Sequence, residues 1–159
     1  MGYGLANRPP TNKDEPMAHY RTTLISRLGV EEAFAYLEDF SHCQSWDPSV
    51  VEANRLDDGP IAKGSRFRVV ASFLGRKVQL EYVVTAFEPP HRVVFSAALP
   101  RLSSVDEITV ASHEGRTSVT YRSDLKALGI FRPLDPVLSF FFQRLASRAR
   151  EGLERELNK

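Results

Sequence analysis

The side chain best suited to acid–base chemistry in this sequence is the carboxylate of Asp106. Asp106 shares strand parity with Ile108 and Val110, so its carboxylate is expected to point toward the apolar side of a sheet. A buried carboxylate needs a polar partner or a raised pKa, and both are common features of functional sites. The alternative is a position near the end of the strand, where water reaches the carboxylate.

Two tyrosines, Tyr82 and Tyr121, have the same inward parity. Each offers an apolar ring and one hydroxyl, which suits an oxygen-bearing ligand in an apolar pocket. The alternative is core packing with the hydroxyl bonded to the backbone. Asp106 with Tyr82 or Tyr121 is the one donor and acceptor set that the sequence offers, so these three are candidate catalytic residues, although nothing in their spacing compels a reaction.

Other kinds of reactive site find little support in the residue spacing. The histidines are scattered over different elements without paired ligand spacing, so we expect no metal site; they are His19, His42, His91 and His113. Cys43 follows His42, but neighbours in a helix rarely face each other, which favours a buried structural thiol over a nucleophile. The sequence has no phosphate loop and no dinucleotide fingerprint, and we expect no cofactor.

Alternating apolar residues predict the strands that would position these side chains. A first strand is expected from His19 to Ser26, and six more over Val50–Leu56, Ser65–Leu74, Lys77–Phe87, His91–Leu99, Leu102–His113 and Arg116–Leu125. The short turns between the last six indicate an antiparallel meander. Arg66, Arg68, Arg76 and Lys77 are assigned to the outer face of one hairpin, as a solvated surface or as a docking surface for an anionic partner or membrane.

Helical spacing appears before and after the predicted sheet. Apolar residues from Val30 to Phe40 predict one helix, and Ser41 could begin a second, short helix that ends near Trp46. A long C-terminal helix is expected from Leu134 to Leu157, with Leu145 in the middle of its apolar stripe. Phe140, Phe141 and Phe142 cannot all face one way, so one ring is expected to be exposed or at an interface.

Composition and length favour one soluble domain. The chain has 159 residues with a formal net charge of +1, which gives no electrostatic case for nucleic-acid binding. One cysteine allows no internal disulfide, which suits a cytoplasmic location. Arg132, Asp135 and Arg144 interrupt the most apolar window, so no transmembrane segment is expected. Residues 1–16 are expected to form a disordered leader before a single domain over 17–159, and the start at Met1 or Met17 stays open, as does monomer or homodimer.

Several short motifs, taken in order, resemble one known superfamily. They are Val30–Leu37, Trp46-Asp47-Pro48, Lys63–Phe67, Phe87–Val94 and Gly115–Tyr121. The set is similar to the START-like (SRPBCC) superfamily, in its polyketide cyclase/dehydrase and lipid-transport branch, over roughly Met17 to Leu157. The resemblance implies an α+β helix-grip fold, in which a curved antiparallel sheet of about seven strands wraps a long C-terminal helix around an apolar cavity.

The resulting functional hypothesis is a protein that binds a hydrophobic small molecule, such as a lipid, a polyketide-like compound or another aromatic compound. Two alternatives stay open: a polyketide cyclase or dehydratase, and a protein-interaction module whose cavity is vestigial. The expected ligand-binding residues are Phe67, Val69, Phe73, Leu80, Tyr82, Phe95, Asp106, Ile108, Tyr121, Leu138, Phe141, Phe142 and Leu145.

Overall fold

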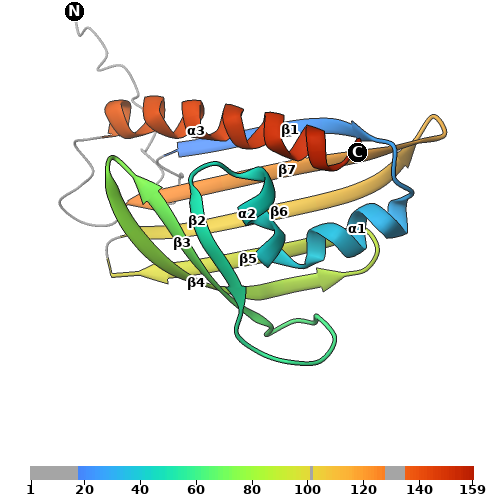
Figure 1. The fold of residues 1–159 in the computed structure, drawn as a ribbon, viewed down its shortest axis with the longest axis horizontal. Coiled ribbons are helices and arrows are strands. Elements are labelled where there is room, and N and C mark those ends of the chain that lie inside the picture. Colours follow the sequence, from blue (N-terminus) through green and yellow to red (C-terminus); the bar gives the residue numbers. More distant parts are fainter. Residues whose placement is uncertain (1–17, 101, 128–134) are drawn as a thin grey trace, which may run out of the picture.

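The protein is a seven-stranded antiparallel sheet with helices on one side (Figure 1). The computed structural model describes residues 18–100, 102–127 and 135–159, and the side chains at 127 and 135–138 lie outside this description, as does the predicted leader. The strands are β1 (Ala18–Ser26), β2 (Val50–Arg55), β3 (Arg66–Phe73), β4 (Arg76–Glu88), β5 (Arg92–Leu99), β6 (Leu102–His113) and β7 (Arg116–Ala127). Their bounds agree with the predicted strands to within two residues.

The strand order in the sheet is β1-β7-β6-β5-β4-β3-β2. Strands β2 to β7 form the predicted meander, because a short turn leaves the next strand beside the previous one. Strand β1 pairs with β7, the strand furthest from it in the sequence, in a register that matches Leu24 with Val119. In this order Asp106 on β6 and Tyr121 on β7 lie on neighbouring strands near one edge of the sheet, whereas Tyr82 lies on β4, on the other side of β5.

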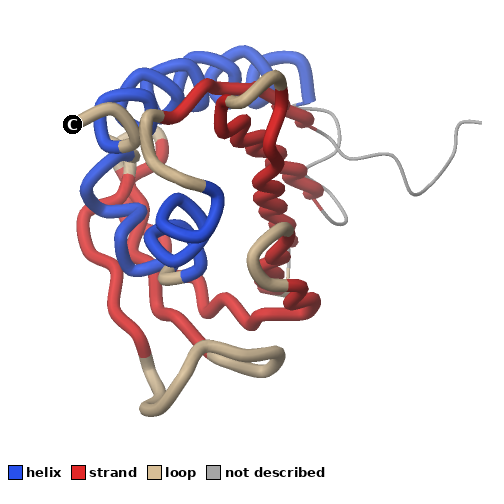
Figure 2. The backbone as a smooth tube through the Cα atoms, turned by 90° about the vertical axis from the view of Figure 1, so that its right-hand side faces the viewer, coloured by secondary structure: helices blue, strands red, loops and turns tan. Residues whose placement is uncertain are grey.

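The sheet curves around an interior, and the helices lie on its concave side (Figure 2). Register shifts between Val50 and Glu52 and between Val84 and Ala86 interrupt the pairing of β2 with β3 and of β4 with β5. Such irregularities bend a strand and increase its twist. The curvature gives the concave face enough depth to hold both a packed core and an open cavity.

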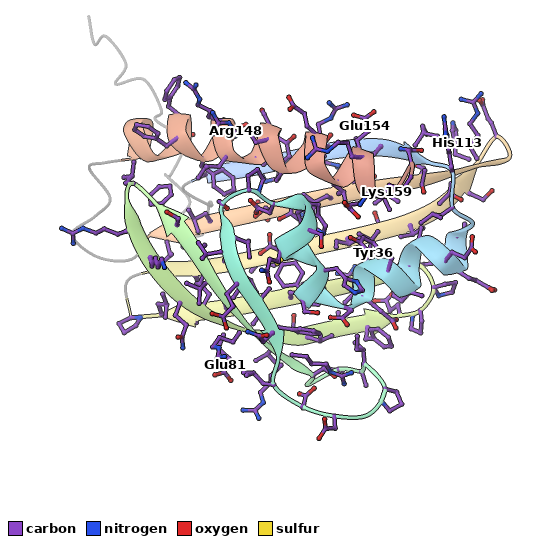
Figure 3. The ribbon with its side chains drawn as sticks, viewed as in Figure 1. Tyr36, Glu81, His113, Arg148, Glu154 and Lys159 are labelled. Carbon is purple, nitrogen blue, oxygen red and sulfur yellow. The ribbon has the colours of Figure 1, made fainter. Side chains whose placement is uncertain are left out.

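Three short helical segments connect β1 to β2: α1 (Val30–Glu38), the 3₁₀ turn η1 (Phe40–His42) and α2 (Cys43–Trp46). The Glu32 carboxylate accepts a hydrogen bond of 3.1 Å from the Gly29 backbone N–H, which satisfies a free donor at the start of α1. Helix α1 buries Ala33, Phe34 and Leu37. The Tyr36 hydroxyl donates to Glu156 Oε2 over 3.4 Å and so links α1 to the C-terminal helix (Figure 3).

The long C-terminal helix, α3 (Asp135–Glu156), lies along β1 (Figure 1). The Arg150 Nε donates to Thr22 Oγ1 over 3.0 Å, and Ser26 Oγ donates to the Leu157 carbonyl, also over 3.0 Å. Arg148 and Glu154 lie on the outer side of α3, away from the sheet (Figure 3). None of the helices in the described part of the chain is both long and apolar enough to cross a membrane.

Gly152 allows α3 to approach α2 closely. A Cβ atom at position 152 would lie 1.9 Å from the backbone carbonyl oxygen of Trp46, far inside van der Waals contact. Glycine is unfavourable in a helix interior, so this residue is explained by the close approach and not by helix propensity. The contact fixes Trp46 and the neighbouring Asp47 against the helix that covers the sheet.

The core occupies the half of the concave face beneath α1 and the end of α3. Its fully buried side chains include Val93, Ile108, Val119, Leu153 and Leu157. The curved sheet, the long C-terminal helix and the two-part interior form the helix-grip fold that the sequence motifs implied.

Candidate functional site

A cavity of about 710 Å³ lies between the concave face of the sheet and the middle of α3. It has the size typical of a small-molecule site. Its lining comes from the η1–α2 region, the six strands β2 to β7, and α3. It comprises Phe40, Cys43, Trp46, Asp47, Ser49, Val50, Val69, Ala71, Ser72, Phe73, Arg76, Val78, Leu80, Tyr82, Leu99, Pro100, Leu102, Ser104, Asp106, Tyr121, Ser123, Leu125, Phe142, Leu145, Ala146 and Ala149. Apolar side chains predominate, so the cavity suits an apolar ligand.

Eight of the expected ligand-binding residues line this cavity: Val69, Phe73, Leu80, Tyr82, Asp106, Tyr121, Phe142 and Leu145. They come from β3, β4, β6, β7 and α3, so the fold brings together side chains from distant parts of the sequence. Leu145 was expected in the packed middle of the helix stripe, but it is only half-buried. Ala149, Leu153 and Leu157 carry the buried part of that stripe instead.

Four expected residues lie elsewhere. Phe67, Phe95 and Ile108 have no exposed surface and lie in the core, outside the cavity lining. The Phe40 ring, which lines the cavity, stacks on Phe95 with 4.2 Å between ring centroids and so separates the ring of Phe95 from the cavity. Phe141 is 38% exposed and also lies outside the lining.

The side chain of Leu138 lies outside the described part of the chain. Of the phenylalanine run, Phe142 faces the cavity and Phe140 is 64% exposed. The expectation that one ring of the run is exposed is therefore correct.

Asp106 forms the polar centre of the cavity. Its side chain is buried, with 3% of the residue surface exposed, so it does not lie at a solvent-exposed end of the strand. The Tyr121 hydroxyl donates to Asp106 Oδ1 over 2.6 Å, and the Ser104 hydroxyl donates to Oδ2 over 3.1 Å. The register explains this proximity, because Asp106 lies opposite Ser123 on β7, two residues from Tyr121.

Burial raises the pKa of Asp106 above its ordinary value, while hydrogen bonds from Tyr121, Ser123, Tyr82 and Ser104 oppose that rise. Burial, with the neighbouring Asp106 charge next in importance, also raises the pKa values of Tyr82 and Tyr121 well above their ordinary value. Both phenols therefore keep their protons at neutral pH. The cluster can hold a polar group of a ligand, and it contains the proton donor and acceptor that acid–base chemistry requires.

A second carboxylate, Asp47, lines the same cavity. Its Oδ1 accepts hydrogen bonds from the backbone N–H and the hydroxyl of Ser49, at 2.8 and 2.7 Å. Burial raises the pKa of Asp47, and the charge of Asp106 adds to this effect. Burial and the charges of Asp47 and Asp106 raise the pKa of the Cys43 thiol, which agrees with its interpretation as a structural thiol.

The assignment of four basic residues to one outer face is wrong for Arg76. On β4 it shares parity with Val78, Leu80 and Tyr82, and it lines the cavity. Arg66 pairs with Glu81 over 3.5 Å on the outer face, where Glu81 is visible in Figure 3. The error came from grouping Arg76 with its neighbour Lys77, which points to the opposite side of the strand.

The cavity also contains residues that the sequence patterns did not single out as ligand-binding, including Phe40, Trp46, Asp47 and Ser104. Ser104 shares the parity of Asp106, so this signal was available in the sequence. Asp47 precedes Pro48 and entered the sequence analysis only as part of the Trp46-Asp47-Pro48 motif, with no binding role. In the described part of the chain, His, Cys, Asp and Glu side chains form no group of three or more that could hold a metal ion.

Solved structures with a similar fold come from several bacteria. A protein from Thermus thermophilus gives a TM-score of 0.72 at 15% identity, over 87% of this chain and 96% of that one. The Zhui aromatase/cyclase from Streptomyces sp. R1128 gives 0.70 at 12% identity, over 87% and 92%. A START superfamily protein from Mycobacterium smegmatis gives 0.68 at 11% identity, over 87% and 96%. At these identities the similarity establishes the fold alone, and no curated protein sequence matches the chain.

The sequence itself matches a family described as polyketide cyclase / dehydrase and lipid transport, over residues 17–158. The match covers nearly the whole chain, including every strand and helix that contributes to the cavity. The chain therefore belongs to the polyketide cyclase/dehydrase and lipid transport family.

Proposed function

We propose that this protein binds and carries a hydrophobic small molecule, a lipid or a polyketide-like or other aromatic compound, in the cavity beneath α3. The open volume of about 710 Å³ with a mainly apolar lining is the observation that supports this function most strongly. Burial of apolar ligand surface would stabilise the complex by roughly 25 cal/mol per Å² before the costs of association. An interaction module with a vestigial cavity is less favoured, because side chains do not fill this space.

Mass spectrometry of the purified protein under gentle conditions tests the proposal. A bound compound should appear as a mass excess over the chain, and denaturation should release it as an apolar small molecule. The same preparation should take up an added apolar dye once the compound has been extracted. A protein that carries no compound and takes up no apolar dye would contradict the proposed function.

An enzymatic function is the second candidate, because Asp106 and Tyr121 form a short buried hydrogen bond that faces the cavity. A cyclase or dehydratase would need these groups to exchange a proton with its substrate. Binding requires only the cavity, whereas catalysis also requires a substrate atom within reach of this pair. We therefore place binding first and assign Asp106, Tyr82 and Tyr121 as candidate catalytic residues only.

A further inference from the structure

The charged residues of the cavity lining are separated by sign. Asp106 and Asp47 lie with the buried tyrosine cluster, whereas Arg76 is exposed at the β3–β4 turn. Arg76 is the only basic residue among the described lining residues. Within the described residues its guanidinium has no carboxylate partner, in contrast to Arg66 and Arg68 on the outer face. The end of the cavity at the β3–β4 turn, which we call the mouth, therefore offers an unpaired positive charge to a ligand.

The buried polar cluster consists of Asp106, Ser104, Tyr121, Tyr82 and Ser123, and it presents hydrogen-bond acceptors to the cavity. A hydroxyl has one proton to donate, and Tyr121 and Ser104 donate theirs to the two oxygens of Asp106. The hydroxyls of Tyr82 and Ser123 lie beside the same carboxylate and act to lower its pKa. The oxygens of Asp106, Tyr121 and Ser104 keep lone pairs that can accept a hydrogen bond from a ligand, whereas the protons of both hydroxyls are already engaged. This end of the cavity therefore favours a ligand hydroxyl over a ligand carbonyl or ether.

The two ends lie along one strand. Arg76 and Tyr82 are both on β4, on the same face, and they lie six positions apart along an extended chain. At about 3.3 Å per residue the separation is at most about 20 Å. A ligand that reaches both ends must therefore be elongated, with an apolar middle that lies against Val78 and Leu80.

We propose that the cavity takes an elongated amphiphile with an anionic group at one end and a hydroxyl at the other. Arg76 holds the anionic group at the mouth, and the oxygens around Asp106 accept the hydrogen bond of the hydroxyl. The reverse orientation would place an anion beside Asp106 and Asp47 in an apolar surrounding, where like charges repel strongly. This inference rests on the proposed function and specifies the ligand class for the same cavity.

Displacement of the neutral dye Nile red by a set of twelve-carbon probes tests this inference. The probes are 12-hydroxydodecanoate, dodecanoate, 12-methoxydodecanoate and dodecan-1-ol. We expect 12-hydroxydodecanoate to bind about 3- to 10-fold tighter than dodecanoate, the value of one hydrogen bond. An apolar cavity without an acceptor site would give the opposite order, because the hydroxyl must lose its water. The methoxy compound should show no gain, since it has no proton to donate.

Variants at two adjacent residues test the other end. Arg76→Met removes the charge at the mouth. It should lower the affinity for 12-hydroxydodecanoate by about 3- to 10-fold and leave the affinity for dodecan-1-ol unchanged, because the alcohol carries no charge. Lys77→Met is the matched control, because Lys77 is also exposed and basic but points away from the cavity. Both residues are exposed at a turn, so neither variant should impair folding.

The outcomes separate this inference from the proposed function. The two-ended ligand would be wrong if Nile red binds and all four probes displace it equally. It would also be wrong if Arg76→Met and Lys77→Met have equal effects. Either result would leave the carrier function in place. A protein that binds neither Nile red nor any probe would overturn both.

Discussion

The hydroxyl of Tyr121 donates a 2.6 Å hydrogen bond to Oδ1 of Asp106 inside a largely apolar cavity. The two residues come from adjacent strands, β6 and β7, and neither is more than 7% exposed. A carboxylate buried to this degree is stable only because several hydroxyls converge on it. The pair is therefore the point at which binding and catalysis can be distinguished by experiment.

Asp106→Asn distinguishes a carrier from an enzyme once a ligand is known. Asparagine has nearly the same shape and keeps hydrogen-bonding capacity, but it cannot exchange a proton as a carboxylate does. For a carrier we expect a change in ligand affinity of about 0.5–1.5 kcal/mol at most. For an enzyme that uses this carboxylate, turnover should fall by about 10²- to 10⁴-fold with little change in affinity. Full turnover in the variant would eliminate Asp106 as the catalytic acid or base.

The same substitution should change how stability depends on pH. Burial raises the pKa of Asp106 above the ordinary value of 3.8, so the folded protein keeps a proton that the unfolded chain has already released. This contribution to stability is present at acidic pH and is lost as the pH rises from 3.8 through the raised folded-state pKa. Urea melts should show wild-type stability falling relative to Asp106→Asn with rising pH, by at most about 1.4 kcal/mol per pH unit.

Asp57→Asn provides a control of opposite sign for this pH experiment. Desolvation acts to raise the pKa of Asp57, but the Arg66 backbone N–H and the Arg55 side chain outweigh it and lower the pKa. Wild-type stability should therefore fall relative to Asp57→Asn as the pH drops from the ordinary pKa of 3.8 through the lowered folded-state pKa of this group. If the two difference curves had the same sign, the assignment of Asp106 as a group with a raised pKa would be wrong.

Two leucines of α3 should differ in their effect on stability. Leu153 is fully buried in the core, so Leu153→Ala should lower the free energy of unfolding by about 2–5 kcal/mol. Leu145 is half-buried against an open cavity, so Leu145→Ala should cost less than about 1.5 kcal/mol. Denaturant melts of both variants measure the difference. Equal losses would mean that the space around Leu145 is packed and not open.

Gly152→Ala tests the contact between α2 and α3. In an ordinary helix interior this change gains about 1 kcal/mol from helix propensity. Here the added methyl group would lie 1.9 Å from the Trp46 carbonyl oxygen, so we expect a net loss of more than about 2 kcal/mol in thermal or denaturant melts. Ser147→Ala, on the exposed face of the same helix, should be neutral or slightly stabilising. A gain in stability from Gly152→Ala would contradict the close approach.

Strand alternation was sufficient to predict the inward positions of Tyr82, Asp106 and Tyr121, because the side-chain period of two follows directly from strand geometry. It could not predict that β1 pairs with β7, since that pairing joins distant segments. Nor could it show which inward residues reach the cavity. The ring of Phe40, from a short turn before β2, covers Phe95, and this packing depends on the tertiary structure.

Arg76 shows a different limit of the sequence patterns. A basic residue beside a turn is usually assigned to the solvated face, as it was here. Only the structure shows that the inward row of β4 continues to the turn and ends in a charge at the cavity mouth. The apolar part of the site was therefore partly accessible from sequence patterns, whereas its polar ends depended on the register of the strands and on the packing of the helices.

Titration of Nile red into the wild type and a cavity-filling variant, with bound compounds removed from both, is the most direct measurement. Ala146 is buried and lines the cavity, so Ala146→Phe should occupy the space without loss of folding. Ser147→Phe, one residue along on the exposed face, is the control for an added aromatic ring. We predict tight dye binding by the wild type and Ser147→Phe and a loss of at least about tenfold in Ala146→Phe. Equal binding by all three proteins would show that the dye lies outside the cavity and would contradict a ligand-binding function there.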